Sequence, residues 1–516
     1  MKNLPRLALL IYGCLILERV LVEFPRATLT LDSVYYALGA SRFSEGAFGE
    51  TFSGPWQPLM AWLAGIQVFL GLDPLTAVVT LSVIGGGLAV VMFTRIAYVM
   101  GGWPAALITG AGLASDQRVL FESAAVRSDG LYLGIAAVIF GLLLKPYDRD
   151  QGRVELSFFG WCAVLGAILV ALRVAALPVV GFIGLCLLFG YKISRKARTI
   201  GVVVFSAAVG LVLGVFCLFY YRRFGVFVPS LNFVLNKFLL IAEWSKTDPE
   251  AFCRLYDGKN TMLADLQFLD PSVRTLPVVP PIDPLVIANY RSQVLPAAYI
   301  VGSHMVGPYV WAGVGLGIVA LVKRRWNKFL GFVFLWTLFS CGAQLFSTIQ
   351  YRFFLPMIGP LYLLAGLGVS YFVPREWKGF RVQYLAALLF ILNVWAGRVH
   401  MNPGYLLSGK WVAGPVLVGD YIKKTYGAGR TIMAIGAYPS LIRAHARFKT
   451  VPCVGTDQIE AYIQDKRVEF VIIPKPIDQY AGPTVQAIVT RPGSLLDLEQ
   501  ETDHELLYRV KGGVDK

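Results

Sequence analysis

The sequence has little charge, little histidine and no paired cysteine motif. Only 15% of its 516 residues are Asp, Glu, Lys or Arg, whereas soluble domains average about 25%. Seven cysteines occur without a CxxC spacing, and the four histidines stand apart at His304, His400, His445 and His504. These absences exclude an ordinary soluble domain and argue against a structural zinc site.

Nucleotide-binding loops are also missing. The sequence has no Walker loop, which argues against ATP-driven transport. Its glycine-rich strings at 85–87 and 313–320 lie inside apolar runs, where glycine typically allows helices to pack closely. We therefore interpret these glycines as packing positions rather than as a phosphate cradle.

Long apolar runs take the place of charge. Hydrophobic residues make up 56% of the chain, and its mean hydropathy is +0.61. A membrane-spanning helix needs about 20 apolar residues. These runs predict an α-helical polytopic membrane protein with about eleven transmembrane helices. The predicted segments are 7–23, 75–98, 102–115, 129–145, 156–172, 174–191, 199–220, 305–322, 329–348, 353–373 and 382–398.

The basic residues that give the chain its net charge of +15 lie mostly in short loops between the apolar runs. The positive-inside rule places such loops in the cytoplasm, which requires the short apolar run 58–72 to lie in the interface rather than cross. We therefore expect a cytoplasmic N-terminus, an interfacial helix at 58–72 and no nucleic-acid partner. Because Glu18 and Arg19 interrupt the first run, we expect a retained helix rather than a signal peptide. The basic clusters are Arg95, 145–153, 192–198, 323–328 and 375–381.

This topology predicts two domains: a transmembrane module at 1–400 and an extracytoplasmic domain at 401–516. The third outer loop is rich in proline and long enough to carry its own structure, so we expect short helices at 230–245 and 285–298. Cys253 and Cys453 lie in polar regions, and their spacing leaves open whether they pair. The outer loops are 24–74, 115–128 and 222–304.

The C-terminal region alternates helical and strand patterns. A helical pattern at 416–426 precedes a strand-like run at 431–437. A second strand-like run at 448–453 precedes a helix at 456–466 and a buried-strand pattern at 468–474. Helices that alternate with apolar strands predict a small parallel α/β domain.

The first outer loop combines a carboxylate with aromatic residues and glycines. The stretch Leu31–Trp62 reads LDSVYYALGASRFSEGAFGETFSGPWQPLMAW. Its acid, Asp32, follows the first apolar run and stands beside Tyr35 and Tyr36. A carboxylate at the outer edge of a membrane helix, with aromatic side chains around it, is suited to chemistry on a sugar or an alcohol.

Three segments resemble the GT-C superfamily of membrane glycosyltransferases, which use polyprenyl-phosphate-linked sugars as donors. Residues 32–62 are similar to their first outer loop, with Asp-x-x-Tyr-Tyr, a Gly/Phe turn and Trp-x-Pro-Leu. FESAAVRSDGLYL at 121–133 is similar to the acid/Arg/Asp segment before their fourth helix. QYRFFLPMIGPLYLLAG at 350–366 is similar to their late Arg-Phe-x-x-Pro-x-x-Pro segment. The resemblance covers most of the membrane region and implies a GT-C-like fold.

The resemblance implies that Asp32 is the catalytic base. A phosphate-linked sugar has a fair leaving group, so its transfer needs a base for the acceptor proton and cations for the phosphate charge. One carboxylate suffices for a single inverting displacement. The alternative is a helix cap, because Asp32 comes directly before a helical pattern. Ser33 stands where many relatives carry a second acid, so we expect neither a divalent metal nor another cofactor.

The second outer loop offers further polar groups. Glu122, Arg127 and Asp129 are candidates for binding the acceptor or the sugar. The alternative for the two acids is an ion pair with Arg118 or Arg127 at the start of the next helix.

Two arginines are candidates for holding the donor phosphate. Arg173 lies between two apolar runs, where a cation is costly unless it is paired or snorkels. Arg352 lies in the YRFFLP segment, and a guanidinium group can bind phosphate through two hydrogen bonds. Snorkelling to lipid headgroups is the alternative for Arg173.

Aromatic residues of the first loop form the last set of candidates. Tyr35, Tyr36 and Trp56, with Trp62 nearby, are candidates for stacking on a sugar or lining an acceptor groove. The alternative is an aromatic belt at the membrane interface.

These features predict an integral-membrane glycosyltransferase in the plasma or inner membrane, with its active site on the extracytoplasmic face. The expected partners are membrane lipid, a polyprenyl-phosphate sugar and a lipid, glycan or protein acceptor. One alternative is a secondary transporter or lipid flippase, although such proteins commonly have related halves and we find none. Another is a glycan polymerase or ligase that uses a diphosphate-linked donor.

Overall fold

The computed structural model describes most of the helical region and parts of the C-terminal region. Arg352, Trp56, Cys253, Cys453 and the predicted helices of the third outer loop lie outside the described residues. Contacts divide the chain into a first unit (Met1–Phe24, Val78–Phe216, Pro284–Asn402) and a second unit (Pro25–Ala77, Cys217–Asp283, Pro403–Lys516). The described residues are 4–23, 31–51, 57–144, 156–191, 194–224, 227–230, 307–342, 354–372, 376–377, 380–400, 418–434, 440, 444, 446–449, 460–461, 463–464, 467–475, 489, 494–502 and 505–511.

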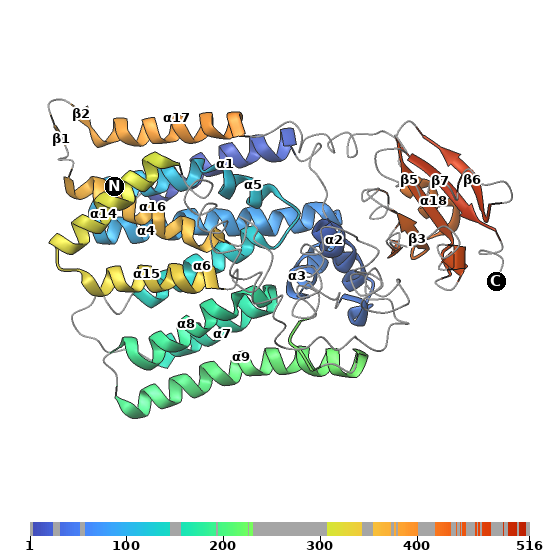
Figure 1. Cartoon of the computed structure of the whole chain (residues 1–516), viewed down its shortest axis with the longest axis horizontal. Helices are drawn as coiled ribbons and strands as arrows, with labels where there is room; N and C mark the ends of the chain where they lie inside the picture. The colour runs from blue at the N-terminus through green and yellow to red at the C-terminus, as the bar shows by residue number, and fades with distance from the viewer. Residues whose placement is uncertain are drawn as a thin grey trace, which may run out of the picture. The chain divides into compact units, whose positions relative to one another are not determined.

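The first unit is a helical bundle, and every predicted apolar segment coincides with a helix in its described part. Its long helices run roughly along one direction in Figure 1. The described α-helices of this region are α1 (Leu4–Glu23), α4 (Pro74–Ser115), α5 (Gln117–Ala124), α6 (Asp129–Leu144), α7 (Leu156–Leu172), α8 (Leu177–Leu185), α9 (Arg195–Phe224), α14 (Pro308–Lys323), α15 (Asn327–Gly342), α16 (Leu355–Phe372) and α17 (Val382–His400). Short helical turns come directly before and after α8, at η4 (Val174–Ala176) and η5 (Cys186–Gly190). A two-stranded hairpin of β1 (Glu376–Trp377) and β2 (Phe380–Arg381) lies between α16 and α17.

Helix α4 contains the break that the sequence predicted between 75–98 and 102–115. Gly102 has a φ of 73° and a ψ of −166°, and Pro104 follows two residues later. Glycine tolerates the positive φ, and proline cannot donate a backbone hydrogen bond. Among the described helices, three are long and apolar enough to cross a membrane: Pro74–Ser115, Arg195–Arg222 and Leu355–Phe372. The number of crossings remains a prediction.

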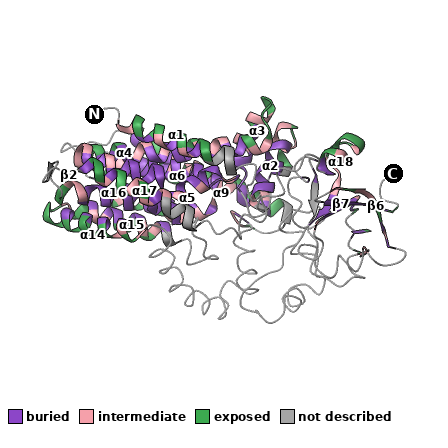
Figure 2. Ribbon diagram, turned by 90° about the horizontal axis from the view of Figure 1, so that it is seen from above, coloured by how far each residue is buried: buried purple, intermediate pink, exposed green. Residues whose placement is uncertain are grey.

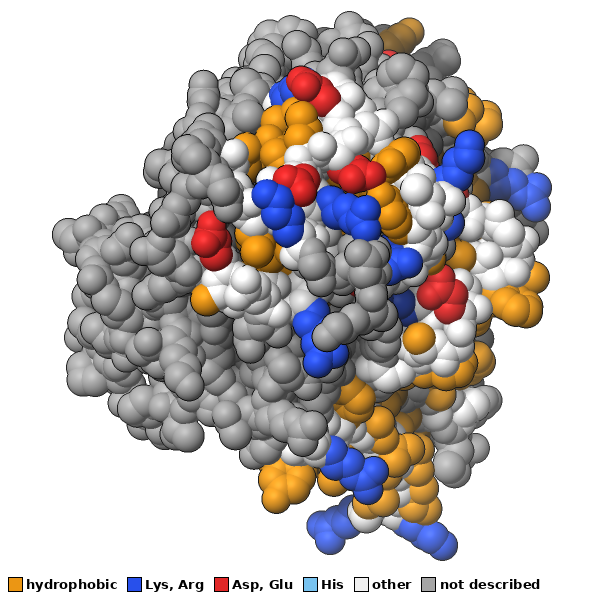
Figure 3. Space-filling view, turned by 90° about the vertical axis from the view of Figure 1, so that its right-hand side faces the viewer, with side chains coloured by type: hydrophobic (Ala, Val, Ile, Leu, Met, Phe, Trp, Pro, Cys, Tyr) orange, Lys and Arg blue, Asp and Glu red, His pale blue; other side chains and the backbone are white. Residues whose placement is uncertain are grey.

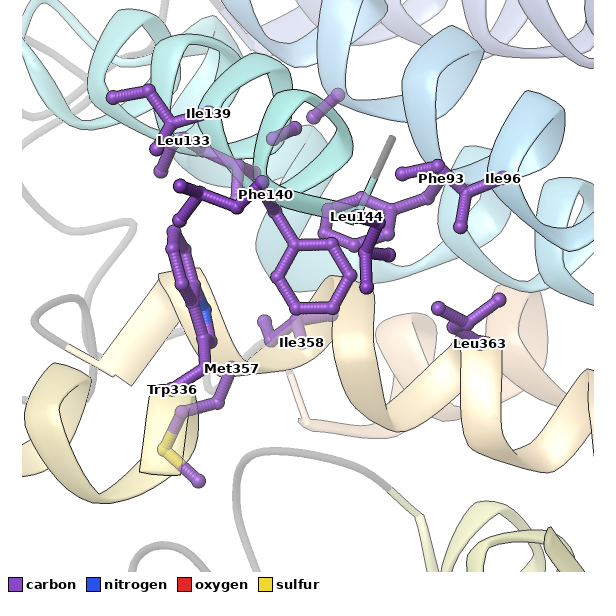
Figure 4. Packing of buried hydrophobic residues seen from close by; sticks show 14 of the residues in the cluster. Phe93, Ile96, Leu133, Ile139, Phe140, Leu144, Trp336, Met357, Ile358 and Leu363 are labelled. Atoms are coloured by element: carbon purple, nitrogen blue, oxygen red, sulfur yellow. The ribbon is translucent and has the colours of Figure 1, made fainter. Parts of the chain in front are cut away.

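Aromatic side chains fill the core of the bundle. Phe140 lies between Phe93 and Trp336, with ring centroids 5.3 Å and 5.1 Å away (Figure 4). The indole nitrogen of Trp336 donates to the carbonyl oxygen of Pro356 at 3.1 Å. A buried indole stabilises a core when its N–H finds such a partner.

Buried residues lie in the interior of the bundle, and exposed residues lie on its outer helices (Figure 2). Helix α9 leaves Leu211, Leu218 and Val203 more than half exposed. Large apolar side chains are expected to point outward where a helix faces lipid rather than water. This pattern agrees with a membrane protein.

Glycines bring helices of the first unit into close contact, as the sequence predicted. A Cβ at Gly85 would overlap the carbonyl oxygen of Gly130, and a Cβ at Gly134 would overlap that of Gly85. A Cβ at Gly317 on α14 would likewise overlap the carbonyl oxygen of Leu364 on α16. The α4–α6 and α14–α16 contacts therefore depend on the absence of side chains at these positions.

The second unit combines the first outer loop with the C-terminal domain. In the loop, α2 (Leu31–Ser44) packs against α3 (Leu59–Phe69), and the short η2 (Phe48–Thr51) connects toward α3. Helix α3 coincides with the predicted interfacial helix at 58–72, whose location in a membrane stays a prediction. The C-terminal elements are α18 (Val418–Tyr426), β3 (Thr431–Ala434), β4 (Arg447–Lys449), β5 (Phe470–Pro474), β6 (Leu496–Glu501) and β7 (Glu505–Val510).

The C-terminal sheet has the strand order β4-β3-β5-β7-β6. Strand β3 pairs in parallel with β4 and β5, as predicted. The prediction of a parallel domain holds for these three strands and not for the rest of the sheet, because β7 pairs antiparallel with both β5 and β6. An antiparallel edge on a parallel sheet is a common arrangement.

Charge is mixed on the face drawn in Figure 3. Acidic and basic side chains lie interspersed among its described residues. Interspersed charge of both signs is typical of a surface in contact with water.

Candidate active site

The segment from Asp116 to Asp129 carries the second set of candidate residues. Asp116 caps α5: its Oδ1 accepts hydrogen bonds from the backbone N–H groups of Arg118 at 2.9 Å and Val119 at 3.1 Å. An aspartate at this position satisfies backbone donors that the helix leaves without partners. The side chain of Asp116 therefore holds the start of α5, which ends at Ala124.

Glu122 and Arg127 face each other within this segment. Glu122 is 1% exposed, and its Oε2 lies 3.6 Å from the guanidinium Nη1 of Arg127. The hydroxyl of Ser82 on α4 donates to the backbone carbonyl of Arg127. The predicted alternative of an ion pair is thus present for Glu122, and the backbone beside it is tied to α4.

Asp129 and Arg173 form a direct, buried ion pair. Asp129 opens α6 and is 1% exposed, and its Oδ1 accepts from Nη1 of Arg173. Arg173 stands in extended backbone between α7 and the short helical turn at 174–176. Its guanidinium lies 5.7 Å from the ring centroid of Tyr132. The sequence expected Arg118 or Arg127 as the partner of Asp129, and the structure shows Arg173 instead.

This pair gives Arg173 a fixed orientation. The side chain is 13% exposed, so it is nearly but not completely enclosed. A guanidinium group carries five N–H donors in one plane and can hold an anion while it contacts a carboxylate. Asp129 can therefore aim Arg173, and snorkelling to headgroups does not describe its position.

Asp32 lies in the second unit, within the first turn of α2. Because the helix begins at Leu31, Asp32 is inside the helix rather than directly before it. Its side chain is only partly buried, whereas Ser33 to Ser41 behind it are all buried. A carboxylate in the first turn is also favoured by the helix dipole.

The C-terminal domain supports α2. Val34, Ala37 and Leu38 share a hydrophobic cluster with Val418 of α18 and with residues of the sheet. The guanidinium of Arg42, one residue from the buried stretch, donates to the backbone carbonyl of Ala446 at 3.3 Å. The helix that carries Asp32 therefore packs on the domain that ends the chain.

The aromatic candidates are placed unevenly. Tyr35 and Tyr36 are 8% and 5% exposed, so both side chains are buried. Trp62 donates its indole N–H to the hydroxyl of Thr51 at 2.7 Å. Contact of any of these rings with a sugar stays a prediction.

The sequence analysis missed a polar cluster around Asp116. Tyr362 donates its hydroxyl to Oδ2 of Asp116 at 2.9 Å, and Asn393 contacts the Tyr362 hydroxyl at 3.1 Å. Both come from segments predicted to span the membrane. A polar side chain inside an apolar run is itself a signal of this kind, and Asn393 in the run FILNVWAG carries it.

Comparison with known proteins identifies the fold. No family model matches the sequence, and no curated protein matches it. Solved structures do match, and they are membrane glycosyltransferases of the GT-C superfamily. The chain therefore has the GT-C fold, and the resemblance inferred from the three sequence segments is confirmed at the level of the fold.

One match runs the whole length of the chain. The crystal structure of ArnT from Cupriavidus metallidurans bound to undecaprenyl phosphate gives a TM-score of 0.53 at 12% identity, over 100% of this chain and 99% of that one. The Archaeoglobus fulgidus oligosaccharyltransferase AglB, in complex with an inhibitory peptide and a dolichol-phosphate, gives 0.52 at 14% identity, over 91% and 69%. A second structure of that oligosaccharyltransferase, with zinc and sulfate, gives 0.51 at 13% identity, over 91% and 67%.

Proposed function

We propose that the chain is an integral-membrane glycosyltransferase that transfers a sugar from a polyprenyl-phosphate-linked donor to a lipid, glycan or protein acceptor. The observation that carries this proposal is the full-length structural similarity to an enzyme whose crystal structure holds undecaprenyl phosphate. The similarity covers 100% of this chain and 99% of the other chain.

The chemistry is a single displacement at the anomeric carbon. The acceptor hydroxyl oxygen forms a bond to this carbon, and the bond from the carbon to the phosphate oxygen breaks. Polyprenyl phosphate leaves with the electron pair, and Asp32 takes the acceptor proton. The configuration at the anomeric carbon inverts, because only one displacement occurs.

The arginines hold the phosphate charge. Arg173 is oriented by its ion pair with Asp129, and we assign to it and to Arg352 the role of binding the donor phosphate. Guanidinium groups in a nearly dry setting stabilise the charge that develops on a leaving phosphate. We assign this role to the arginines and give no role to a divalent metal.

The acids of the second loop are assigned to the acceptor or the sugar. Glu122, Arg127 and Asp129 lie on one short segment whose two ends are fixed by Asp116 and by the contact of Ser82 with Arg127. Fixed polar groups of this kind can orient hydroxyl groups without reorganising during the reaction.

The extracytoplasmic location is supported by the second unit. Helix α2, predicted to be on the outer face, packs against the C-terminal domain, so the two must lie on the same side of the membrane. We therefore expect a reporter fused after Lys516 to be active only outside the cytoplasm. A reporter that is active in the cytoplasm would place Asp32 on the wrong side as well.

The proposed activity is tested by analysis of lipid-linked glycans in a strain that lacks the protein. We expect one glycosylated product to disappear and one polyprenyl-monophosphate sugar to accumulate. Accumulation of a diphosphate-linked donor would favour the polymerase or ligase alternative. Unchanged glycans together with a misplaced lipid would favour a flippase.

A further inference from the structure

A buried polar cluster lies where several helices of the first unit meet. It contains Asp116, Tyr362 on α16, Asn393 on α17 and Ser115 at the end of α4, each at most 4% exposed. Tyr309 at the start of α14 contributes its hydroxyl. None of these groups is used by the displacement described above.

Hydrogen bonds connect Tyr309, Asn393, Tyr362 and Asp116 within this cluster. The Tyr309 hydroxyl donates to Oδ1 of Asn393. The Asn393 amide nitrogen lies 3.0 Å from the carbonyl oxygen of Gly112 and 3.1 Å from both the Ser115 and Tyr362 hydroxyl oxygens. The Tyr362 hydroxyl then donates to Oδ2 of Asp116. One branch of these hydrogen bonds therefore reaches the carboxylate that caps α5, through Tyr362, and other branches end on the backbone carbonyl oxygens of Gly112 and Ala111.

Asp116 depends on these donors. Its burial raises the pKa of the carboxyl group, while the Arg118 charge and the hydrogen bonds from Val119, Tyr362 and Arg118 act in the opposite direction. A buried carboxylate is stable only when such donors surround it. Without the Tyr362 hydroxyl, Oδ2 loses a donor and the cap of α5 weakens.

We propose that Tyr362 and Asn393 are positioning residues that hold the Asp116 carboxylate, and through it the start of α5, so that Glu122 and Arg127 stay in place. This role rests on the proposed function, because it assigns those two residues to the acceptor or the sugar. The residues act from α16 and α17, which lie 246 and 277 positions further along the chain than Asp116 and approach it only in the folded protein.

The test compares two tyrosine-to-phenylalanine variants of the full-length protein in lipid nanodiscs. Tyr362→Phe removes the hydroxyl that reaches Asp116. Tyr191→Phe is the matched control, because that buried hydroxyl donates to the backbone carbonyl of Leu143 at 2.8 Å, at the opposite end of α6 from Asp129. Tyr191→Phe removes a hydrogen bond to a neutral carbonyl group, whereas Tyr362→Phe removes the hydrogen bond to the Asp116 carboxylate and the one from Asn393, so Tyr362→Phe is expected to lower the melting temperature more.

Hydrogen exchange followed by mass spectrometry measures the positioning directly. In Tyr362→Phe, peptides covering 116–124 should exchange about tenfold faster, because the capped N–H groups open more often. In Tyr191→Phe these peptides should be unchanged. Sugar transfer should fall about tenfold in Tyr362→Phe and stay near the wild-type rate in Tyr191→Phe, since a displaced binding group lowers the rate.

Three results would overturn the proposal: unchanged exchange at 116–124 in Tyr362→Phe, equal changes in both variants, or faster exchange with normal transfer. Asn393→Ser, which shortens the amide that supports Tyr362, serves as the second variant if Tyr362→Phe does not fold. A wild-type protein that transfers no sugar would overturn the proposed function, and the exchange comparison would still decide whether the two residues position α5.

Discussion

Asp32 and Asp129 are both aspartates in the first turn of a helix, yet their surroundings differ. Asp32 is partly exposed at the start of α2, whereas Asp129 is 1% exposed and joined to Arg173. If Asp129 accepted a proton, Arg173 would remain nearly buried without its counter-charge, which is costly. The difference teaches that position in a helix does not decide the role of an acid: Asp129 is suited to hold a cation and Asp32 to accept a proton.

The supports of the two acids differ as well. Helix α2 presents a continuous buried stretch to the second unit, so apolar packing holds Asp32 in place. The segment at 116–129 is held by polar contacts at its two ends and by the glycine contact of α4 with α6. A substitution at Asp32 should therefore lower activity without lowering stability, whereas a substitution at Asp129 should lower both.

The largest effect is expected at Asp32. Asp32→Asn should lower sugar transfer at least about 10²-fold, because the amide cannot accept the acceptor proton, while the melting temperature stays within a few degrees of the wild type. Asp73→Asn is the matched control, since Asp73 also stands at a helix start and accepts from the Thr76 N–H at 3.0 Å. Equal rates in the two variants would assign Asp32 a purely structural role.

The next effect concerns the ion pairs of the second loop. Arg173→Met leaves Asp129 buried without its partner and should destabilise the protein by about 3–5 kcal/mol. Arg127→Met should cost less, about 1 kcal/mol, because its nitrogen–oxygen separation from Glu122, at 3.6 Å, is longer than a hydrogen bond. Thermal unfolding in one detergent checks both, and a larger loss at Arg127 would reverse the ranking of the two pairs.

A further effect, smaller than that of Arg173→Met, is expected at the glycine contact. Gly85→Ala forces a Cβ into the backbone of Gly130 and Leu131 and should destabilise by about 1–3 kcal/mol. Gly210→Ala on α9 meets nothing within 4 Å and should be neutral or slightly stabilising, because alanine favours a helix. If the two variants melt alike, close packing of α4 on α6 does not hold the 116–129 segment.

The long helices of the first unit could be predicted from the sequence because each corresponds to a long run of apolar residues. The break at Gly102 was visible as well, since glycine and proline interrupt an apolar run. Strand β6 was missed because LDLEQE has mostly exposed or half-exposed side chains and gives no buried-strand pattern, whereas β7 was overlooked although its run ELLYRV is mostly buried. Short apolar strands such as β5 were found because both of their faces are buried.

The site could be predicted only where a residue carries its own signal. Asp32 and Arg173 stand out as charges beside apolar runs, and both retain their assigned roles as proposals. The pairing of Arg173 with Asp129 joins residues 44 positions apart, and neither residue type nor local spacing indicates it. The burial of Val34, Ala37 and Leu38 likewise follows from the packing of α2 on distant segments, which a local pattern does not contain.

The account depends most directly on transfer of a sugar by the purified protein in lipid. A labelled polyprenyl-monophosphate sugar is supplied with acceptor lipids from the deletion strain, and the label on the acceptor is measured for the wild type and for Asp32→Asn at equal amounts. We predict transfer by the wild type and none above background by the variant. Equal transfer by both proteins, or transfer only from a diphosphate-linked donor, would contradict the account.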